Sequence, residues 1–195
     1  MGYYLNPGNG EFARAIRSEI YVDKTGMLVY TNKYLNTEQS FICVSRPRRF
    51  GKSMALKMLA AYYSRGCDSR ELLKGLEIEK APDFEEHLNK YDVIYLDMSK
   101  FLNGAQEDGM IKYLEKKVLR ELRKAYGEFL EEQDIGLVDG LERIYEETGH
   151  PFIFLIDEWD CVMRERQESG GLQRQYLDFM LCLLKDQAYV ELAYI

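Results

Sequence analysis

Two patterns of hydrophobic and polar positions alternate along this chain, and together they predict strands separated by helices. Short runs of consecutive apolar residues are typical of strands buried on both faces, whereas apolar residues three and four positions apart are typical of amphipathic helices. The apolar runs predict strands at 20–22, 41–45, 93–98, 152–156 and 189–195. The helical spacing predicts helices at 26–34, 51–64, 111–126, 140–147 and 172–185. Because the two kinds of element alternate, we expect an α/β fold with a parallel sheet covered on both faces.

The length and composition are those of one ordinary globular domain. The chain has 195 residues, of which 46% are hydrophobic and 30% charged, and it contains no internal repeat or linker-like tract. Its longest apolar runs, such as 152–156, are far too short to span a membrane, and its first residues lack the pattern of a secretory signal. Three of the four cysteines lie in apolar segments, which favours buried, reduced thiols in a cytoplasmic protein.

Charge is distributed unevenly, although the net charge of −7 argues against a general nucleic-acid coat. Residues 46–66 carry six basic side chains and no acid, whereas residues 127–160 carry eleven acids and a single basic side chain, Arg143. Two solvated faces of opposite charge would give the same distribution. The basic cluster, however, begins where the strand at 41–45 ends and a helix begins, which is where α/β proteins bind phosphates.

The sequence SRPRRFGKS at 45–53 is similar to the phosphate-binding pattern G-x-x-x-x-G-K-[ST]. Gly51, Lys52 and Ser53 match the end of the pattern, but Arg46 occupies the position of its first glycine. The alternative interpretation is an ordinary basic turn followed by a chance GKS. Because an apolar strand precedes this loop and an apolar helix follows it, we favour phosphate binding.

The chemistry of this loop explains the residue types in it. The backbone N–H groups of 50–53 would point at the phosphates from the start of a helix, Lys52 would lie between the β- and γ-phosphates, and the Ser53 hydroxyl would bind Mg²⁺. Two arginines could add positive charge in cis, or could equally face solvent or a partner. The residues expected to bind the nucleotide are Arg48, Arg49, Phe50, Gly51, Lys52 and Ser53.

A second part of the site is expected at the end of another buried strand. The apolar run 152–156 is followed directly by Asp157 and Glu158. Asp157 would hold Mg²⁺ together with Ser53, and Glu158 would polarise the attacking water. Two acids after a strand are also typical of a helix start, so the assignment depends on the phosphate loop upstream.

Four runs of residues resemble one protein family. YVDKT at 21–25, RPRRFGKS at 46–53, YLDMS at 95–99 and LIDE at 155–158 are similar to the AAA-ATPase-like family, whose members resemble archaeal and STAND-type P-loop ATPases. The resemblance covers nearly the whole chain, and the family itself lacks the first glycine of the general pattern. It implies a three-layer P-loop NTPase fold with a mainly parallel sheet in the order 5-1-4-3-2, and it implies ATP and Mg²⁺ as cofactors.

The resemblance also implies roles for particular residues. It carries over Gly51, Lys52 and Ser53 as phosphate and Mg²⁺ residues, and Asp157 with Glu158 as the Walker B pair. Lys52 and Glu158 would then be the catalytic residues, and Ser53 and Asp157 the metal ligands.

Two residues of the first run have no role that the sequence defines. Asp23 and Lys24 match the upstream motif of the family. They would either brace the N-terminal segment or contact the nucleotide.

Members of the family continue with a fifth strand, a helical lid and often a C-terminal PD-(D/E)xK nuclease-like domain. Residues 1–195 would then be the N-terminal part of the ATPase domain, ending after the fourth core strand and leaving 41–45 as an open sheet edge. A nominal nuclease set exists at Asp83 and Glu115, but Glu115 lies within a predicted helix. Because a nuclease needs both acids around one metal, we expect no nuclease activity from this pair.

Three functions fit these observations, and the leading one is an ATP- and Mg²⁺-binding module that hydrolyses ATP slowly and acts as a conformational switch. A non-hydrolysing, nucleotide-dependent interaction module is the first alternative, and Glu158 favours hydrolysis over it. A nucleic-acid-binding protein that uses the RPRR loop is the second. The acidic segment 127–160 and the lack of aromatic residues among the arginines disfavour it.

Overall fold

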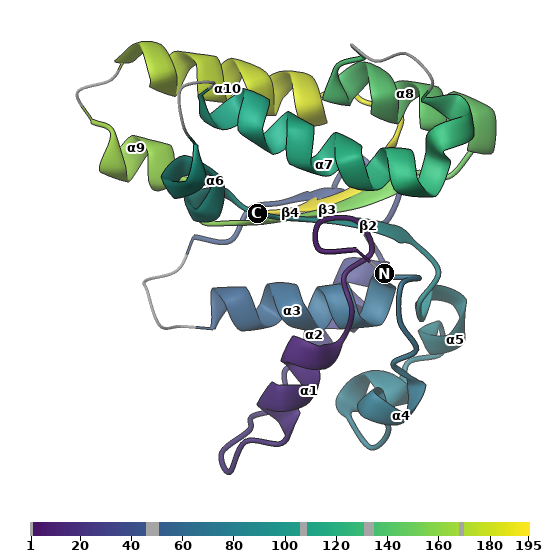
Figure 1. Ribbon diagram of the computed structural model, residues 1–195. Helices are drawn as coiled ribbons and strands as arrows, with labels where there is room; N and C mark the ends of the chain where they lie inside the picture. The colour runs from purple at the N-terminus through teal and green to yellow at the C-terminus, as the bar shows by residue number, and fades with distance from the viewer. Residues whose placement is uncertain (1, 46–50, 106–108, 131–134, 168–169) are drawn as a thin grey trace.

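The computed structural model describes residues 2–45, 51–105, 109–130, 135–167 and 170–195, which form an α/β fold of three layers (Figure 1). In this part of the chain, four parallel strands form the middle layer in the order β1-β4-β3-β2. The strands are β1 (Phe41–Ile42), β2 (Asp92–Asp97), β3 (Phe152–Asp157) and β4 (Val190–Tyr194). The expectation of a parallel sheet covered on both faces is confirmed.

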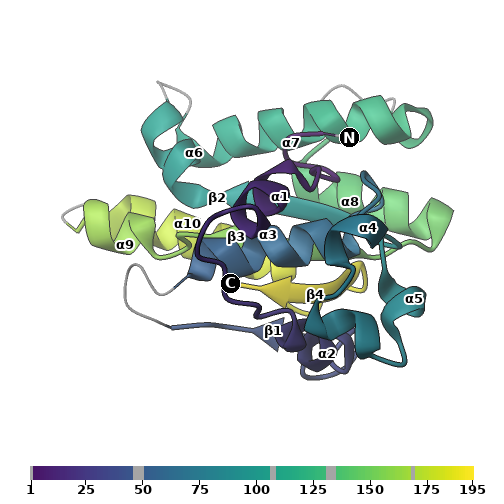
Figure 2. The ribbon, with the colours of Figure 1, turned by 90° about the horizontal axis from the view of Figure 1, so that it is seen from below.

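The helices that precede β2 in the chain cover one face of the sheet, and the helices that follow β2 cover the other face (Figures 1 and 2). The first layer contains α1 (Gly10–Ile16), α2 (Gly26–Asn32), α3 (Lys52–Tyr63), α4 (Arg70–Leu73), the 3₁₀ turn Glu77–Lys80 and α5 (Phe84–His87). The opposite layer contains α6 (Met98–Gly104), α7 (Met110–Tyr126), the 3₁₀ turn Gly127–Phe129, α8 (Leu137–Thr148), α9 (Cys161–Glu165) and α10 (Gly170–Leu184).

The protein has two hydrophobic cores, one on each face of the sheet, and strand β3 contributes side chains to both. Phe152, Phe154 and Ile156 pack in the core beneath α6–α10, whereas Ile153 and Leu155 pack in the core formed with α3. Successive side chains of a strand point to opposite faces, so an uninterrupted apolar run is what a strand needs when helices cover both faces. This arrangement fixes the carboxyl end of β3 next to the first turn of α3.

The segment before α1 covers the outer edge of β2. The backbone N–H of Asn6 donates to the Val93 carbonyl at 2.7 Å, and the backbone N–H of Tyr95 donates to the Tyr4 carbonyl at 2.8 Å. The Glu121 carboxylate of α7 accepts bonds from the backbone N–H groups of Tyr3, Tyr4 and Leu5 at 2.8–3.0 Å. This segment therefore protects the β2 edge from pairing with other chains and also forms a wall beside the strand ends.

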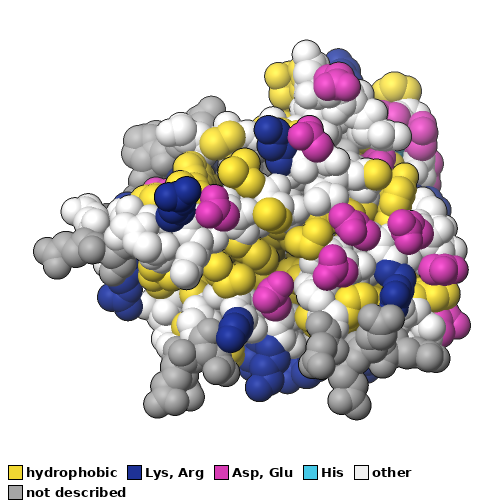
Figure 3. Space-filling view, turned by 90° about the horizontal axis from the view of Figure 1, so that it is seen from above, with side chains coloured by type: hydrophobic (Ala, Val, Ile, Leu, Met, Phe, Trp, Pro, Cys, Tyr) yellow, Lys and Arg dark blue, Asp and Glu magenta, His cyan; other side chains and the backbone are white. Residues whose placement is uncertain are grey.

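The outer face of the α6–α10 layer carries apolar as well as charged side chains (Figure 3). Leu177 and Leu181 of α10 are 43% and 55% exposed. By contrast, α7 and α8 bury their apolar stripes, which include Leu114, Val118 and Leu141. Among the described residues, no helix is long and apolar enough to cross a membrane.

Three sequence expectations are corrected by the structure. The expected strand at 20–22 is not formed, because Ile20 and Val22 are 86% and 67% exposed and no strand pairs with them. The strand expected at 41–45 is assigned only at Phe41–Ile42, although the Val44 N–H still donates to the Ile195 carbonyl at 2.7 Å.

The third correction concerns the thiols. All four cysteines are free, but only Cys161 is buried, whereas Cys43 and Cys182 are exposed and Cys67 is partly buried. An apolar segment near a sheet edge or on an outer helix still has one face in solvent. Apolar neighbours in the sequence therefore do not ensure that a cysteine is buried. A fifth strand beyond β1 stays a prediction.

Candidate functional site

The first turn of α3 begins at a glycine with a left-handed backbone. Gly51 has φ of +83° and is the N-cap of α3, and this first turn contains no acidic residue. Glycine adopts this conformation without the steric penalty that a Cβ atom brings. The turn therefore presents backbone N–H groups that have no partner within the helix, and two polar side chains, Lys52 and Ser53, with no carboxylate of its own to neutralise them.

The carboxyl end of β3 lies against this turn. Asp157 is only 7% exposed, it lines the same cavity as Ser53, and its carboxylate accepts a bond from the backbone N–H of Glu158 at 3.0 Å. Burial raises the pKa of Asp157, and the neighbouring charges of Asp97 and Glu158 raise it further, while the Ser53 hydroxyl opposes the shift. Three acids thus gather at one edge of the sheet, where a cation would relieve their repulsion.

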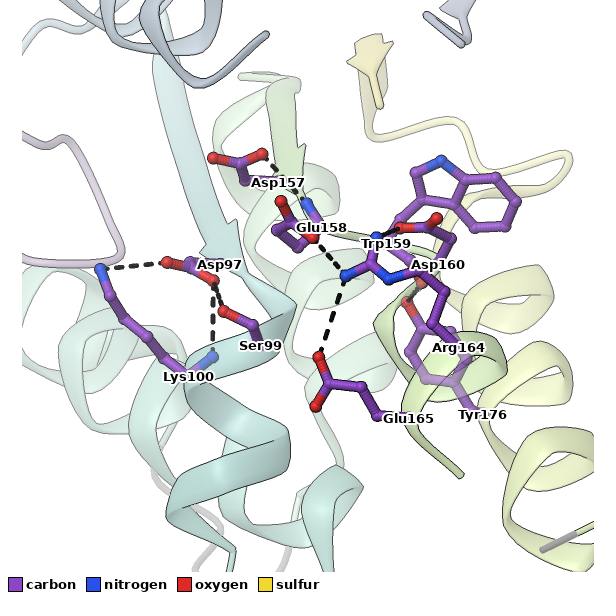
Figure 4. A network of polar contacts seen from close by, with 10 residues as sticks. All are labelled: Asp97, Ser99, Lys100, Asp157, Glu158, Trp159, Asp160, Arg164, Glu165 and Tyr176. Carbon is purple, nitrogen blue, oxygen red and sulfur yellow. Dashed lines mark hydrogen bonds and ion pairs between the residues drawn. The ribbon is translucent and has the colours of Figure 1, made fainter. Parts of the chain in front are cut away.

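Asp97 is a site residue that sequence reasoning missed. It ends β2 in the same register as Asp157 on β3, so the two carboxylates lie on adjacent strands. Its side chain accepts bonds from the Ser99 hydroxyl at 2.7 Å and from the backbone N–H of Lys100 at 3.4 Å, and it forms an ion pair with the Lys100 ammonium at 3.2 Å (Figure 4). The signal in the sequence was an apolar run ending in an acid, the same pattern that identified Asp157.

Glu158 follows Asp157 in an unusual backbone conformation. Its φ is +52°, a region that residues with a side chain rarely adopt. Its carboxylate accepts a bond from the Arg164 guanidinium at 2.5 Å, and the same guanidinium bonds the Asp160 carboxylate at 2.7 Å (Figure 4). Glu158, Asp157 and Lys52 line one small hollow next to the end of β4.

A cavity of about 360 Å³ opens on the other side of Asp157. Ser53 and Asp157 line it together with Tyr3 and Tyr4 of the segment before α1. A ligand in this cavity would touch the head of α3 and the end of β3 together.

The run at 21–25 has a structural role and also reaches the head of α3. The Asp23 carboxylate accepts bonds at 2.8 Å from the N–H and hydroxyl of Thr25 and from the Glu77 N–H. Lys24, held between these anchored residues, has its ammonium nitrogen 3.5 Å from the position that a Gly51 side chain would occupy. The ammonium groups of Lys24 and Lys52 have no ion-pair partner among the described residues.

The remaining expected nucleotide-binding residues, Arg48, Arg49 and Phe50, lie outside the described residues. Of the expected site, Gly51, Lys52 and Ser53 lie together with Asp157 and Glu158 at one edge of the sheet.

The nominal nuclease pair does not form a site. Asp83 is the N-cap of α5, whereas Glu115 lies on α7, and these helices cover opposite faces of the sheet (Figure 1). In the described ranges, no group of three or more His, Cys, Asp or Glu side chains is arranged to hold a metal ion. A metal bound through Ser53 and Asp157 would instead depend on one hydroxyl, one carboxylate and water.

Comparison with known proteins identifies the family. A family model described as a predicted AAA-ATPase matches residues 8–189. The chain belongs to the AAA-ATPase-like family. Membership indicates that the protein binds a nucleotide, and the matched range contains every residue of the site described above except those of the segment before α1. No curated protein and no solved structure matches the chain significantly.

Proposed function

We propose that the protein binds ATP with Mg²⁺ at the head of α3, hydrolyses it slowly and acts as a conformational switch. The observation that carries this proposal is that Ser53 on α3 and the buried Asp157 on β3 line one cavity, next to a left-handed glycine and to Lys52, whose ammonium has no ion-pair partner in the described part of the chain. Residues distant in sequence would thus supply phosphate-binding groups and metal-binding groups at the same point.

Each residue has a role that its position supports. The N–H groups of the first turn of α3 would bind phosphate oxygens, and Lys52 would neutralise charge on the β- and γ-phosphates during transfer. Lys24 would add a second positive charge at the same end of the helix. We also propose that Arg48, Arg49 and Phe50 extend the phosphate loop.

The residues present fit a magnesium ion. Asp157 is buried beside two other acids, and its pKa is raised, so its charge lacks full compensation within the protein. Ser53 and Asp157 would hold Mg²⁺, which would neutralise charge on the phosphate oxygens. Hydroxyl and carboxylate oxygens together with water are the ligands that this ion prefers.

A water molecule beside the γ-phosphate would be the nucleophile. Glu158 would accept its hydrogen and orient it, because the carboxylate follows Asp157 and lines the same hollow as Lys52. In the structure this carboxylate accepts a bond from the Arg164 guanidinium at 2.5 Å.

A second candidate is nucleotide binding without turnover. The observation that favours it is the ion pair between Glu158 and Arg164, since a carboxylate engaged by a guanidinium is a poorer acceptor for water. A nucleic-acid-binding function through the RPRR loop has no support from the described residues, and salt-dependent retention on DNA without ATP would be needed to revive it.

The proposed function is tested by titrating the protein with ATP and GTP, each with and without Mg²⁺, and by following phosphate release. We expect Mg²⁺-dependent binding of ATP and slow turnover. Glu158→Gln should keep the binding and lose the turnover, whereas Asp157→Asn should weaken the dependence of binding on Mg²⁺. Equal turnover in the parent and in Glu158→Gln would remove Glu158 from the reaction.

A further inference from the structure

One guanidinium holds the acidic residues that follow β3. Arg164 on α9 donates to Glu158 at 2.5 Å and to Asp160 at 2.7 Å, and Glu165 lies 3.9 Å from the same group (Figure 4). Bonding to Glu158 raises the pKa of Arg164, so the guanidinium stays charged. The pair lies on the α6–α10 side of the sheet, whereas Lys52 and Lys24 belong to the opposite side.

This arrangement carries strain as well as attraction. Glu158 occupies the left-handed region with φ of +52°, which costs free energy for a residue with a side chain. The Nε atom of Arg164 is buried and has no hydrogen-bond partner among the described residues. The backbone around Trp159 is fixed separately, because its carbonyl accepts a bond from the Tyr176 hydroxyl at 2.7 Å. The Glu158 side chain can therefore turn about its own bonds without rebuilding the neighbouring helices.

We propose that Arg164 is a positioning residue that holds Glu158 toward α9 in the resting protein, and that hydrolysis requires Glu158 to leave Arg164 and face the γ-phosphate. This inference rests on the proposed function and specifies how that site is regulated. Bound Mg²⁺·ATP would give Glu158 a reason to turn, since the water held beside the γ-phosphate offers the carboxylate a hydrogen-bond donor at the hollow that Glu158 shares with Lys52 and Asp157. The ion pair therefore keeps the rate of hydrolysis low.

The test uses Arg164→Gln, Arg164→Lys and a matched control, Arg166→Gln. Arg166 is the exposed C-cap of α9, two residues further on, and its substitution removes the same charge without touching Glu158. Steady-state turnover gives kcat and KM for ATP. We expect Arg164→Gln to raise kcat by about three- to tenfold with KM unchanged, because it removes one partly exposed charge-assisted bond from Glu158. Arg164→Lys should give a smaller increase, and Arg166→Gln none.

Trp159 supplies a readout that does not depend on activity, because it is the only tryptophan of the chain and stands between Glu158 and Asp160. In the nucleotide-free protein, Arg164→Gln and Glu158→Gln should shift Trp159 fluorescence in the same direction, toward that of the parent saturated with Mg²⁺·ATP.

A folded Arg164→Gln variant with equal or lower kcat, or with the fluorescence of the resting parent, would overturn the proposal. Where Arg164→Gln does not fold, Arg164→Lys decides, and a parent-like kcat in that variant also overturns it. If the parent binds no ATP, the proposed function fails, whereas the nucleotide-free fluorescence comparison still tests whether Arg164 holds Glu158.

Discussion

The backbone conformation of Gly51 allows the phosphate-binding hypothesis to be tested by substitution. Its φ of +83° requires glycine, and Lys24 lies 3.5 Å from where a Cβ atom would stand. Gly75 has nearly the same conformation, with φ of +81°, but no atom lies within 4 Å of its added Cβ. The chain thus contains a matched pair of glycines, one at the site and one remote from it.

Gly51→Ala and Gly75→Ala should each destabilise the protein by roughly 1–2 kcal/mol, because each places a Cβ atom in the left-handed region. Only Gly51→Ala should also weaken ATP binding, since its methyl group would stand at the phosphate-facing turn. Urea unfolding measures the first effect and calorimetric titration the second. Equal loss of ATP affinity in both variants would show that the effect is one of stability alone.

Lys24 provides a second test at this scale. Asp23 and Thr25 anchor the segment through their bonds to each other and to the residues at 77 and 78, so the lysine between them can change without loss of the anchor. Lys24→Ala should weaken ATP binding by about three- to tenfold and leave the unfolding midpoint unchanged. Lys33→Ala, on the exposed C-cap of α2, is the control. If Lys24→Ala binds ATP as tightly as the parent, the run at 21–25 has a structural role only.

The sequence revealed the parts of the site that are local in the chain. Gly51, Lys52 and Ser53 form a contiguous motif, and Asp157 follows an apolar run and was assigned in combination with that motif, so local patterns located them. The partnership of Asp97 with Asp157 depends on which strands are neighbours. No local pattern in the sequence determines the order of the strands. The pairing of the Glu158 and Arg164 side chains could not be predicted from a local pattern either.

At the scale of elements, long periodic segments were predictable and short ones were not. Helices α3, α7, α8 and α10 and strands β2, β3 and β4 lie within a few residues of the expected ranges, because each carries several apolar residues at one spacing. Helices α4, α5 and α9 have only four or five residues, too few to show a period. The exposed segment 20–22 has strand-like residues but no neighbouring strand, so tertiary context decides its conformation.

The start of β2 depends on a buried carboxylate that ties four segments together. Asp92 has no exposed surface and accepts bonds from the Asn6 amide and the Tyr126 hydroxyl, both at 2.7 Å. Arg65, which follows α3, forms an ion pair with it at 3.2 Å. These contacts join the N-terminal segment, α3, β2 and α7.

Tyr126→Phe should lower the free energy of unfolding by about 1–2 kcal/mol, because it removes one donor from a carboxyl group that remains buried. The control is Tyr145→Phe on α8, whose hydroxyl has no hydrogen-bond partner among the described residues and whose ring packs on the same core. Equilibrium unfolding in urea provides both values. A Tyr126→Phe protein as stable as the parent would show that Asn6 and Arg65 suffice to compensate Asp92.

At the scale of the whole molecule, the order of strands determines where chemistry is possible. Parallel strands end at one edge of the sheet, so the acids of β2 and β3 collect there, and α3 crosses the face of β3 (Figure 2). The family match over residues 8–189 agrees with this placement, because it indicates a nucleotide-binding protein. We propose that this edge binds ATP through Lys52 of α3.

The most direct measurement is the ATP affinity of Lys52→Ala, determined by isothermal titration calorimetry in the presence of Mg²⁺. Lys74→Ala, on the opposite end of the same helical layer and well exposed, removes the same charge and is the control. The account predicts that the parent and Lys74→Ala bind ATP alike, and that Lys52→Ala binds roughly 30-fold more weakly or not at all, with an unchanged unfolding midpoint. Parent-like affinity in Lys52→Ala, or a parent that binds no ATP, would contradict it.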